Sequence, residues 1–234
     1  MAKPEKYNKG ILYLVATPIG NMGDITFRAL EILADVDVIA AEDTRKTGVL
    51  LKHHGITARM ESYHLANEFR KKDKLISMLI EGKSVAVVSD AGTPGISDPA
   101  YSLVSSAVNS EIKIVPVPGA NSAIAALISS GLPTDKFYFG GFPPRKSGQR
   151  KRFFEEIADR TETSIFFESP YRLMKTISAM REVFGDTRRA AVCRELTKKF
   201  EEIIRGTLAE FDNGDKELKI KGEFVIVVEG NQGE

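Results

Sequence analysis

The sequence predicts an α/β protein of two domains, an N-terminal domain with a mainly parallel sheet and a C-terminal domain with a mixed sheet. Short apolar runs alternate with longer amphipathic ones, which is the pattern of βαβ units. The 234 residues suffice for two small hydrophobic cores. The proline- and glycine-rich segment 116–121 interrupts regular structure. We therefore place the domain boundary there, with domains of residues 1–118 and 119–234.

The first domain begins with an apolar strand at Ile11–Val15. Asp24 is expected to cap a helix whose apolar residues Ile25, Ala29, Ile32 and Leu33 recur at helical spacing. The same patterns predict strands at residues 36–41, 84–89 and 112–117, and helices at 44–54, 71–81 and 101–108, with Gly82 ending the helix at 71–81.

In the second domain, strands are predicted at residues 137–141, 164–167, 189–194, 201–206 and 223–228. Only two long helical stretches, residues 150–158 and 171–184, separate them. Because the last three strands then follow one another through short connections, we expect mixed strand directions in this sheet.

Composition narrows the functional classes. The formal net charge is +1, so a nucleic-acid surface would have to be a local patch. No run of about 20 apolar residues is present, and Met1 to Lys6 lack the apolar run of a secretory signal. Cys193 is the only cysteine and is expected to be a buried strand thiol. His53, His54 and His64 are poorly spaced for zinc, so we expect no metal and a cytoplasmic protein.

Ligands of open α/β sheets bind in the loops at the carboxyl ends of strands. Four such loops carry unusual residues here: 17–24, 42–45, 89–99 and 116–123. The glycine-rich loops contain no lysine, which favours a ligand without phosphates, held by backbone groups and hydroxyls. A plain turn is the alternative interpretation of each loop.

Phosphate-binding motifs do not account for these loops. Gly82-Lys83-Ser84 imitates the end of a Walker loop, but position 77 is serine and the segment runs from helix to strand. No G-x-G-x-x-G sequence follows the first strand, so the dinucleotide-binding fingerprint is absent.

Taken in order, these loops and several later segments resemble the tetrapyrrole-methylase-type (class III) methyltransferase superfamily, most closely its branch that acts on small-subunit ribosomal RNA. The resemblance rests on segments 14–21 (LVATPIGN), 41–45 (AEDTR), 89–99 (SDAGTPGISDP), 118–123 (PGANSA), 140–144 (GGFPP), 167–172 (FESPYR), 193–198 (CRELTK) and 221–225 (KGEFV). It extends from about Ile11 to Gly230, nearly the whole chain.

The resemblance implies a methyltransferase that uses S-adenosylmethionine as co-substrate and is usually a homodimer. It also implies that the C-terminal domain completes the binding site for S-adenosylmethionine. It implies transfer to the 2′-oxygen of a cytidine in 16S ribosomal RNA near the decoding centre. Tetrapyrrole relatives carry a glycine-glycine-aspartate-proline loop where this chain has Ala91-Gly92-Thr93-Pro94. That departure argues against a porphyrinoid substrate and for the RNA branch.

The resemblance also assigns residues to the methyl donor. Carried over by motif, the donor-binding residues are Pro18, Gly92, Thr93, Ile96, Ser122, Ala123, Glu168 and Leu196. Each has a structural alternative: a turn glycine, a core side chain or a helix N-cap.

A protonated ribose hydroxyl is a poor nucleophile, so a general base would assist the transfer. Candidates near predicted strand ends are Glu42, Asp43, Asp90, Glu168 and Glu195, of which we favour Asp43 or Asp90 without choosing between them. Asp43 beside Arg45 has a structural ion pair as its alternative, and Asp90 a turn cap.

The densest basic cluster is residues 145–152, at the start of a predicted helix, where RNA phosphates would meet side chains and backbone donors. We assign RNA contacts to Arg45, Arg145, Lys146, Arg150, Lys151 and Arg152; a solvated helix face is the alternative. Two rival functions remain at this point: a small-molecule methyltransferase of the tetrapyrrole kind, and a non-enzymatic RNA-binding module.

Overall fold

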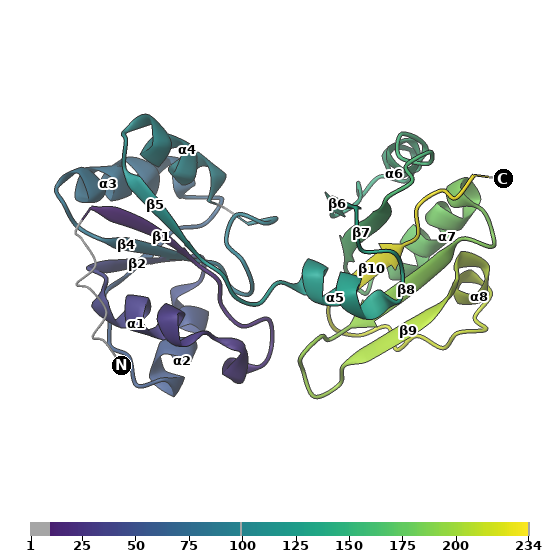
Figure 1. The fold of residues 1–234 in the computed structure, drawn as a ribbon, viewed down its shortest axis with the longest axis horizontal. Coiled ribbons are helices and arrows are strands. Elements are labelled where there is room, and N and C mark those ends of the chain that lie inside the picture. Colours follow the sequence, from purple (N-terminus) through teal and green to yellow (C-terminus); the bar gives the residue numbers. More distant parts are fainter. Residues whose placement is uncertain (1–9, 99, 234) are drawn as a thin grey trace. The chain divides into compact units, whose positions relative to one another are not determined.

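The computed structural model describes residues 10–98 and 100–233. The chain divides into two compact units, Met1–Asn121 and Ser122–Glu234, each built on a five-stranded sheet (Figure 1). The predicted fold class is therefore confirmed, with a parallel sheet in the first unit and a mixed one in the second. Residues Met1 to Lys6, on which the expectation of no secretory signal rests, lie outside the described residues, as does Pro99.

The first unit holds a wholly parallel sheet in the order β3-β2-β4-β1-β5. Its strands are β1 (Ile11–Val15), β2 (Val38–Ala41), β3 (Met60–Ser62), β4 (Val85–Val88) and β5 (Lys113–Val117). Its helices are the 3₁₀ helix η1 (Met22–Asp24) and α1 (Phe27–Asp35), α2 (Thr44–His53), α3 (Glu68–Ile80) and α4 (Tyr101–Asn109). Because all five strands are parallel, their carboxyl ends lie at one edge of the sheet.

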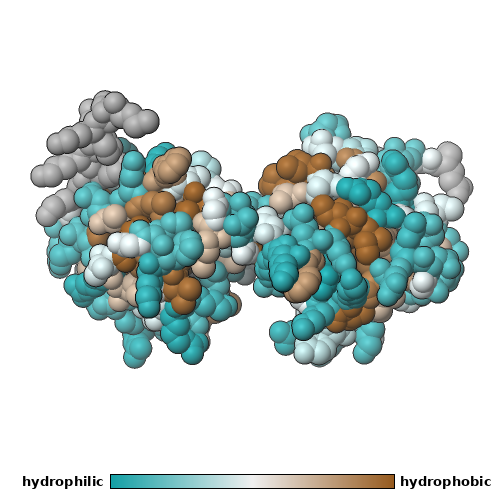
Figure 2. All heavy atoms as spheres, turned by 90° about the horizontal axis from the view of Figure 1, so that it is seen from below, coloured by the Kyte–Doolittle hydropathy of each residue, from teal (hydrophilic) through white to brown (hydrophobic). Residues whose placement is uncertain are grey.

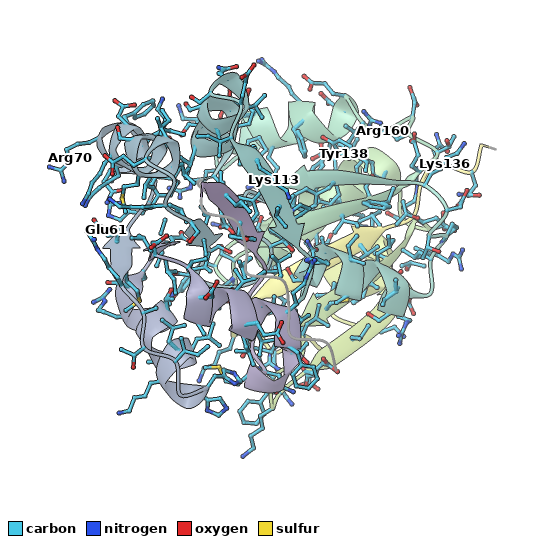
Figure 3. The ribbon with its side chains drawn as sticks, turned by 60° about the vertical axis from the view of Figure 1, so that its left-hand side comes forward. Glu61, Arg70, Lys113, Lys136, Tyr138 and Arg160 are labelled. Atoms are coloured by element: carbon cyan, nitrogen blue, oxygen red, sulfur yellow. The ribbon has the colours of Figure 1, made fainter. Side chains whose placement is uncertain are left out.

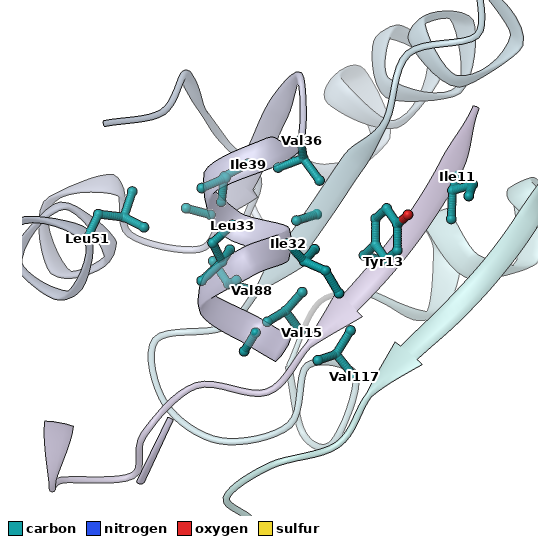
Figure 4. Close-up of a cluster of buried hydrophobic side chains, with 13 residues drawn as sticks. Ile11, Tyr13, Val15, Ile32, Leu33, Val36, Ile39, Leu51, Val88 and Val117 are labelled. Carbon is teal, nitrogen blue, oxygen red and sulfur yellow. The ribbon is translucent and has the colours of Figure 1, made fainter. Parts of the chain in front are cut away.

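Both faces of this sheet are buried. Alternate residues of β1 point to opposite faces, as the two-residue period of a strand requires. Ile11, Tyr13 and Val15 pack in one cluster with α1 and α2 (Figure 4), whereas Leu12 packs in a second cluster with α3 and α4. This arrangement explains why β1, β2 and β4 read as continuous apolar runs.

The start of α1 differs from the prediction. Asp24 does not cap this helix, because residues 22–24 form η1, whose cap is the side chain of Asn21. The N-cap of α1 is Thr26, whose hydroxyl accepts a hydrogen bond from Ala29 N at 3.1 Å. The next strand begins at Val38 rather than at residue 36, because Val36 is the C-cap of α1.

The end of α3 confirms the role predicted for Gly82. This residue has a φ of +85°, and its N–H donates to Leu79 O at 3.0 Å while Lys83 N donates to Met78 O at 2.9 Å. These two bonds form a Schellman motif, which requires the left-handed conformation that glycine adopts without strain. The helix begins at Glu68, three residues before the predicted start.

The edge strand β3 was not predicted. It is three residues long, and its Glu61 accepts hydrogen bonds from Lys74 at 2.7 Å, Lys71 at 3.0 Å and Arg59 at 3.3 Å. The hydrogen bonds from the two lysines lower the pKa of Glu61 to about 2. Glu61 is labelled in Figure 3, where its side chain lies beside this edge of the sheet.

The second unit has a sheet in the order β6-β7-β10-β8-β9, in which only β6 and β7 are parallel neighbours. Its strands are β6 (Phe137–Gly141), β7 (Thr163–Glu168), β8 (Arg189–Arg194), β9 (Glu202–Thr207) and β10 (Phe224–Val228). Its helices are α5 (Ser122–Ser130), α6 (Ser147–Glu155), α7 (Leu173–Phe184) and α8 (Leu208–Asp212).

Helices cover both faces of the second sheet. The helices α6, α7 and α8 share a core with alternate residues of the strands, in which Phe154 contacts the rings of Phe166 and Phe184. The helix α5 packs against β7, β8, β9 and β10. Arg205 of β9 donates from Nε to Ser130 O at 3.1 Å and so holds the last turn of α5.

Several predictions for this unit were wrong in extent or missing. Neither α5 nor α8 was predicted, and α8 lies between β9 and β10, so that connection is not short. The helix α6 begins at Ser147 rather than at residue 150, and α7 begins at Leu173 rather than at residue 171. The expectation for Cys193 is confirmed: the thiol is buried in β8, and burial raises its pKa to about 11.

Apolar side chains also reach the surface. Figure 2 shows them as separate brown areas bordered by hydrophilic residues on both units. Among the large apolar side chains of the described residues, the most exposed are Phe27, Phe69, Tyr101, Ile128 and Tyr171. None of the helices in residues 10–98 and 100–233 is long and apolar enough to span a membrane.

Candidate functional site

The loops that follow β1 and β4 are joined at the carboxyl edge of the first sheet. Thr17 N donates to Gly92 O at 2.8 Å and Gly92 N donates to Thr17 O at 3.0 Å, which makes a short antiparallel bridge. The hydroxyl of Thr17 donates to Ser89 O at 3.3 Å. Two loops that lie more than 70 residues apart in the chain are thus fixed to each other.

The loop that follows β5 joins the same edge. The hydroxyl of Thr93 donates to Ala120 O at 3.2 Å and accepts from Asn121 Nδ2 at 3.3 Å. Gly119 passes so close to β1 that a Cβ there would lie 3.0 Å from the Cβ of Ala16. The loops that follow β1, β4 and β5 therefore meet at this edge of the first sheet, which we call the strand-end rim.

The four donor-binding candidates of the first unit all lie on this rim. Gly92 is buried and has a φ of +82°, a conformation that glycine adopts without strain, and a Cβ there would lie 3.3 Å from Ile19 Cγ2. Thr93 and Pro18 are half-buried. Ile96 keeps 40% of its surface exposed, which leaves an apolar side chain available to a ligand.

Asp43 is committed to the backbone and to a neighbouring cation. Its Oδ1 caps α2 by accepting from Arg45 N at 2.9 Å, and its two oxygens accept from Arg45 Nε at 3.0 Å and from the terminal nitrogen at 2.7 Å. These hydrogen bonds hold the pKa of Asp43 well below its usual range. A carboxylate that holds its charge so strongly is a poor proton acceptor.

Asp90 lies beside Asp43 in the same set of loops but in a different environment. Its Oδ2 accepts from Lys46 Nζ at 2.6 Å, and its backbone N–H donates to Glu42 Oε2 at 3.1 Å. Its Oδ1 is buried and has no hydrogen-bond partner among the described residues. This oxygen therefore has unmet hydrogen-bonding capacity.

Asp98 lies in the loop after β4 and was not predicted as a site residue from the sequence. It follows Ser97, which has a φ of +66°. Burial, followed by the negative charge of Glu42, raises the pKa of Asp98 to about 6, against a lowering hydrogen bond from Ser89. A carboxyl group with a pKa near the working pH suits a general base. The signal that points to it is an aspartate in a strand-end loop.

The rim fits the chemistry of a methyl donor that carries a positively charged sulfonium. Glu42, Asp90 and Asp98 place negative charge there, and Lys46 is already paired with Asp90. Thr93 and the glycine backbones supply neutral hydrogen-bonding groups. No group of three or more histidine, cysteine, aspartate or glutamate side chains within residues 10–98 and 100–233 is arranged to hold a metal ion.

In the second unit, Glu168 lies at the carboxyl end of β7 with its side chain fully buried. Its Oε1 accepts from Ser169 N and Arg172 Nε, both at 2.7 Å, and its Oε2 accepts from Thr176 Oγ1 at 2.6 Å. The carboxylate thus fixes the start of α7. Because both carboxylate oxygens already accept hydrogen bonds, Glu168 is a poor candidate for the general base.

Leu196 is buried in a strained loop after β8. Its neighbours Glu195 and Thr197 have φ values of +51° and +65°, unusual for residues with a side chain. Such strain accumulates at ligand-binding segments. Gly222, with a φ of +100°, allows this loop to pass, because a Cβ there would lie 2.6 Å from the Glu195 side chain. Ser122 and Ala123 form the first residues of α5.

The basic cluster 145–152 lies on the loop before α6 and on its first two turns. Arg145, Lys146 and Arg152 are exposed, and Lys151 is exposed but forms an ion pair with Glu182. Arg150 differs from the others because only 6% of its surface is accessible. Arg45 is exposed on α2 of the first unit and pairs with Asp43.

Comparison with known proteins agrees with this arrangement. The Tetrapyrrole (Corrin/Porphyrin) Methylases family matches residues 11–212. A relative in Halalkalibacterium halodurans named ribosomal RNA small subunit methyltransferase I is 52% identical over 227 residues, which cover 97% of this chain and 78% of the relative. A Bacillus subtilis relative of the same name is 49% identical over 229 residues, 98% and 78% of the two chains.

Solved structures share the fold at low sequence identity. The methyltransferase CobJ has a TM-score of 0.69 at 19% identity, with 95% of this chain and 94% of that chain covered. A uroporphyrin-III C-methyltransferase from Thermus thermophilus, solved with S-adenosylhomocysteine, has a TM-score of 0.63 at 16% identity, with 92% and 96% covered. The chain therefore belongs to the tetrapyrrole methylase family and, within it, to the ribosomal RNA small subunit methyltransferase I family, and is a methyltransferase by class.

Proposed function

We propose that this protein transfers a methyl group from S-adenosylmethionine to the ribose 2′-oxygen of a cytidine in 16S ribosomal RNA, near the decoding centre. The observation that carries the proposal is the identity of about half the residues, over 97% of the chain, with relatives named for small-subunit ribosomal RNA methylation. The cytidine and the ribose oxygen come from the resemblance of the loop motifs. The proposal includes a homodimer that acts in the cytoplasm, where ribosomal subunits are present.

The donor supplies an electrophilic methyl group, so the protein has two tasks: alignment and proton removal. Rigid loops favour alignment, and positioning contributes as much as about 7–11 kcal/mol in suitable cases. The bridge between Thr17 and Gly92 and the Thr93 hydrogen bonds supply that rigidity on the rim. The resemblance assigns Ser122, Ala123, Glu168 and Leu196 to the same donor.

For the proton of the ribose hydroxyl we propose Asp98 as the acceptor, ahead of Asp90 and Asp43. At pH 7 a carboxyl group with a pKa of about 6 is mostly ionised, yet it holds a proton better than an ordinary aspartate. Asp90 is the second choice because Lys46 already neutralises one of its oxygens. Asp43 is the third because Arg45 occupies both of its oxygens.

A small-molecule methyltransferase is the alternative, and the fold shared with uroporphyrin and cobalamin enzymes favours it. Threonine at position 93 and the basic cluster 145–152 weigh against it. The deciding experiment incubates the protein with methyl-labelled donor and either purified small subunits, naked 16S RNA or uroporphyrinogen. We expect label in the subunit or its RNA, at a ribose; label in the tetrapyrrole, or in none of the three, would remove the proposal.

The exposed part of the basic cluster gives a quantitative test of RNA contact. Replacing Arg145, Lys146 and Arg152 together by alanine should weaken RNA binding and reduce the steepness of the log–log salt dependence by about 2, since each lost phosphate contact on single-stranded RNA contributes about 0.7. Binding is measured by fluorescence anisotropy of labelled RNA between low and moderate salt.

The matched control replaces Lys52, Lys113 and Lys136, three exposed lysines that are not part of the cluster, and so changes the net charge by the same amount. An equal reduction in both triple variants would show that net charge alone acts, and would count against the cluster as the RNA-binding surface.

A further inference from the structure

A pocket of about 750 Å³ lies within the second unit, lined by α6, α7 and the last residue of α8. The helices pack side by side, α6 on α7 and α7 on α8, as Figure 1 shows. The side chains that matter for its chemistry are Ser147, Arg150 and Lys151 from α6, and Lys175 and Ser178 from α7. This lining combines cations with hydroxyl groups.

Arg150 is the unusual member of the lining. It is 6% exposed, and its Nε is buried without a hydrogen-bond partner among the described residues. Its guanidinium makes a weak hydrogen bond from a terminal nitrogen to Arg145 O at 3.4 Å, and no ion pair within residues 10–98 and 100–233 includes it. A buried guanidinium that lacks an anion costs free energy, so its position indicates that an anion binds beside it.

The first turn of α6 offers further donors to the same pocket. The first N–H groups of a helix have no intrahelical acceptor, and the side chain of the N-cap residue Lys146 makes no cap hydrogen bond to them. Gly148 lies in this turn and lines the pocket, although a Cβ there would meet nothing within 4 Å. Glycine is unfavourable inside a helix, and nothing in the packing requires it, but it leaves the backbone open to a ligand.

The remaining charges do not cancel Arg150. Glu182 pairs with Lys151, and Asp212 pairs with Arg181 at 3.1 Å. Lys175 is exposed at the pocket and forms no ion pair with another described residue. The pocket therefore presents Arg150, Lys175 and a helix N-terminus to an incoming group, which is the donor set of a phosphate site.

We propose that this pocket binds one backbone phosphate of the substrate RNA, with Arg150 as its central ligand and Lys175 at its mouth. The proposal rests on the proposed function for the identity of the RNA. It makes Arg150 different in kind from the exposed cations of the same cluster: they add to a general field, whereas Arg150 fixes one phosphate and so sets the position of the strand.

The test compares the wild-type protein with Arg150→Met, Lys175→Met and the control Lys136→Met, an exposed lysine that does not line the pocket (Figure 3). Binding of labelled small-subunit RNA is measured against salt. Arg150→Met should weaken binding by about 10- to 100-fold, as loss of a hydrogen bond to a charged group predicts, and should reduce the salt steepness by about 0.7 to 1. Lys136→Met should leave both values near those of the wild type.

Two further measurements separate the explanations. The thermal midpoint of free Arg150→Met should equal or exceed that of the wild type, because the variant removes a charge without a partner; a lowered midpoint with unchanged salt steepness would assign Arg150 a purely structural role and overturn the proposal. Calorimetry with S-adenosylhomocysteine should give equal affinity in all variants. If the wild type does not bind S-adenosylhomocysteine, the result counts against the proposed function. The phosphate pocket is judged by the RNA measurements alone.

Inorganic phosphate and sulfate provide the last arm. If millimolar phosphate raises the midpoint of the wild type but not of Arg150→Met, and RNA binding is equal in both, the pocket is a small-anion site and the RNA assignment is wrong. If neither anion nor RNA distinguishes the two proteins, the phosphate site is excluded.

Discussion

Asp98→Asn is expected to lower kcat for methyl transfer by about 10²- to 10⁴-fold, the usual contribution of a general base. Burial and the charge of Glu42 give Asp98 a pKa of about 6. Below that pH the wild-type rate should fall tenfold for each pH unit, because only the ionised carboxylate accepts a proton. Above it the rate should level off. The variant should show a low rate without this inflection.

The controls for this prediction are Asp43→Asn and Asp90→Asn. Asparagine caps helices about as well as aspartate, so Asp43→Asn should keep α2 and most of the activity. An Asp98→Asn protein that retains wild-type kcat together with the inflection near pH 6 would reject the assignment, and the loss of that inflection in Asp90→Asn would transfer it to Asp90.

The same group should leave a signature in stability. Its folded-state pKa lies above the ordinary value of 3.8, so between about pH 4 and 6 the folded protein binds more protons than the unfolded chain. Asp98 therefore makes the free energy of unfolding fall as the pH rises through this window. Asp98→Asn should remove that slope, which denaturant unfolding at pH 4, 5, 6 and 7 would reveal.

Glu168→Ala is expected to lower the free energy of unfolding by about 3–5 kcal/mol, since it removes one partner of a buried, hydrogen-bonded ion pair. The substitution leaves the Thr176 hydroxyl and Ser169 N without their acceptor and Arg172 without its anion. Urea unfolding followed by circular dichroism measures the loss. Glu162→Ala, just before the same strand, should change stability by less than about 0.5 kcal/mol, because its ion pair with Arg160 is a long 4.0 Å contact.

A second substitution at Glu168 tests whether its backbone or its carboxylate contacts the donor. With its carboxylate oxygens held by Ser169, Arg172 and Thr176, a donor contact would use the backbone of Glu168. Glu168→Gln should then retain donor affinity while losing part of the stability. A large loss of affinity in a stable Glu168→Gln protein would show that the carboxylate itself binds the donor.

The strands were the most predictable part of the fold. Ile11–Val15, Phe137–Gly141 and Arg189–Arg194 have the bounds expected from the sequence, because each contains a short run of apolar residues that is too short for a helix. The helix α5 was missed: Ser122–Ser130 follows a proline- and glycine-rich segment and contains no charged residue to mark a helical face. The strand β3 was missed because three partly buried residues carry too little pattern.

Site residues were predictable from the sequence where they directly follow a predicted strand. They were not predictable where a raised pKa depends on residues that the fold brings together. Gly92 and Thr93 follow a buried strand, and the structure places them on the rim. The raised pKa of Asp98 depends on burial and then on Glu42, 56 positions earlier in the chain, so no local pattern reveals it. The burial of Arg150 did have a signal, because Arg150, Phe154 and Ile157 recur at helical spacing on the buried side of the segment that begins as α6.

The short strand β3 has a consequence for solubility. An open parallel sheet presents unpaired backbone groups along its outermost strands, and a long, flat, apolar border invites another polypeptide to add itself there. Here that border is three residues long and carries Glu61 among three cations. A strand from another chain would have to displace this ionic cluster and would gain very few hydrogen bonds in return. Aggregation by sheet extension is therefore disfavoured at this side of the first unit.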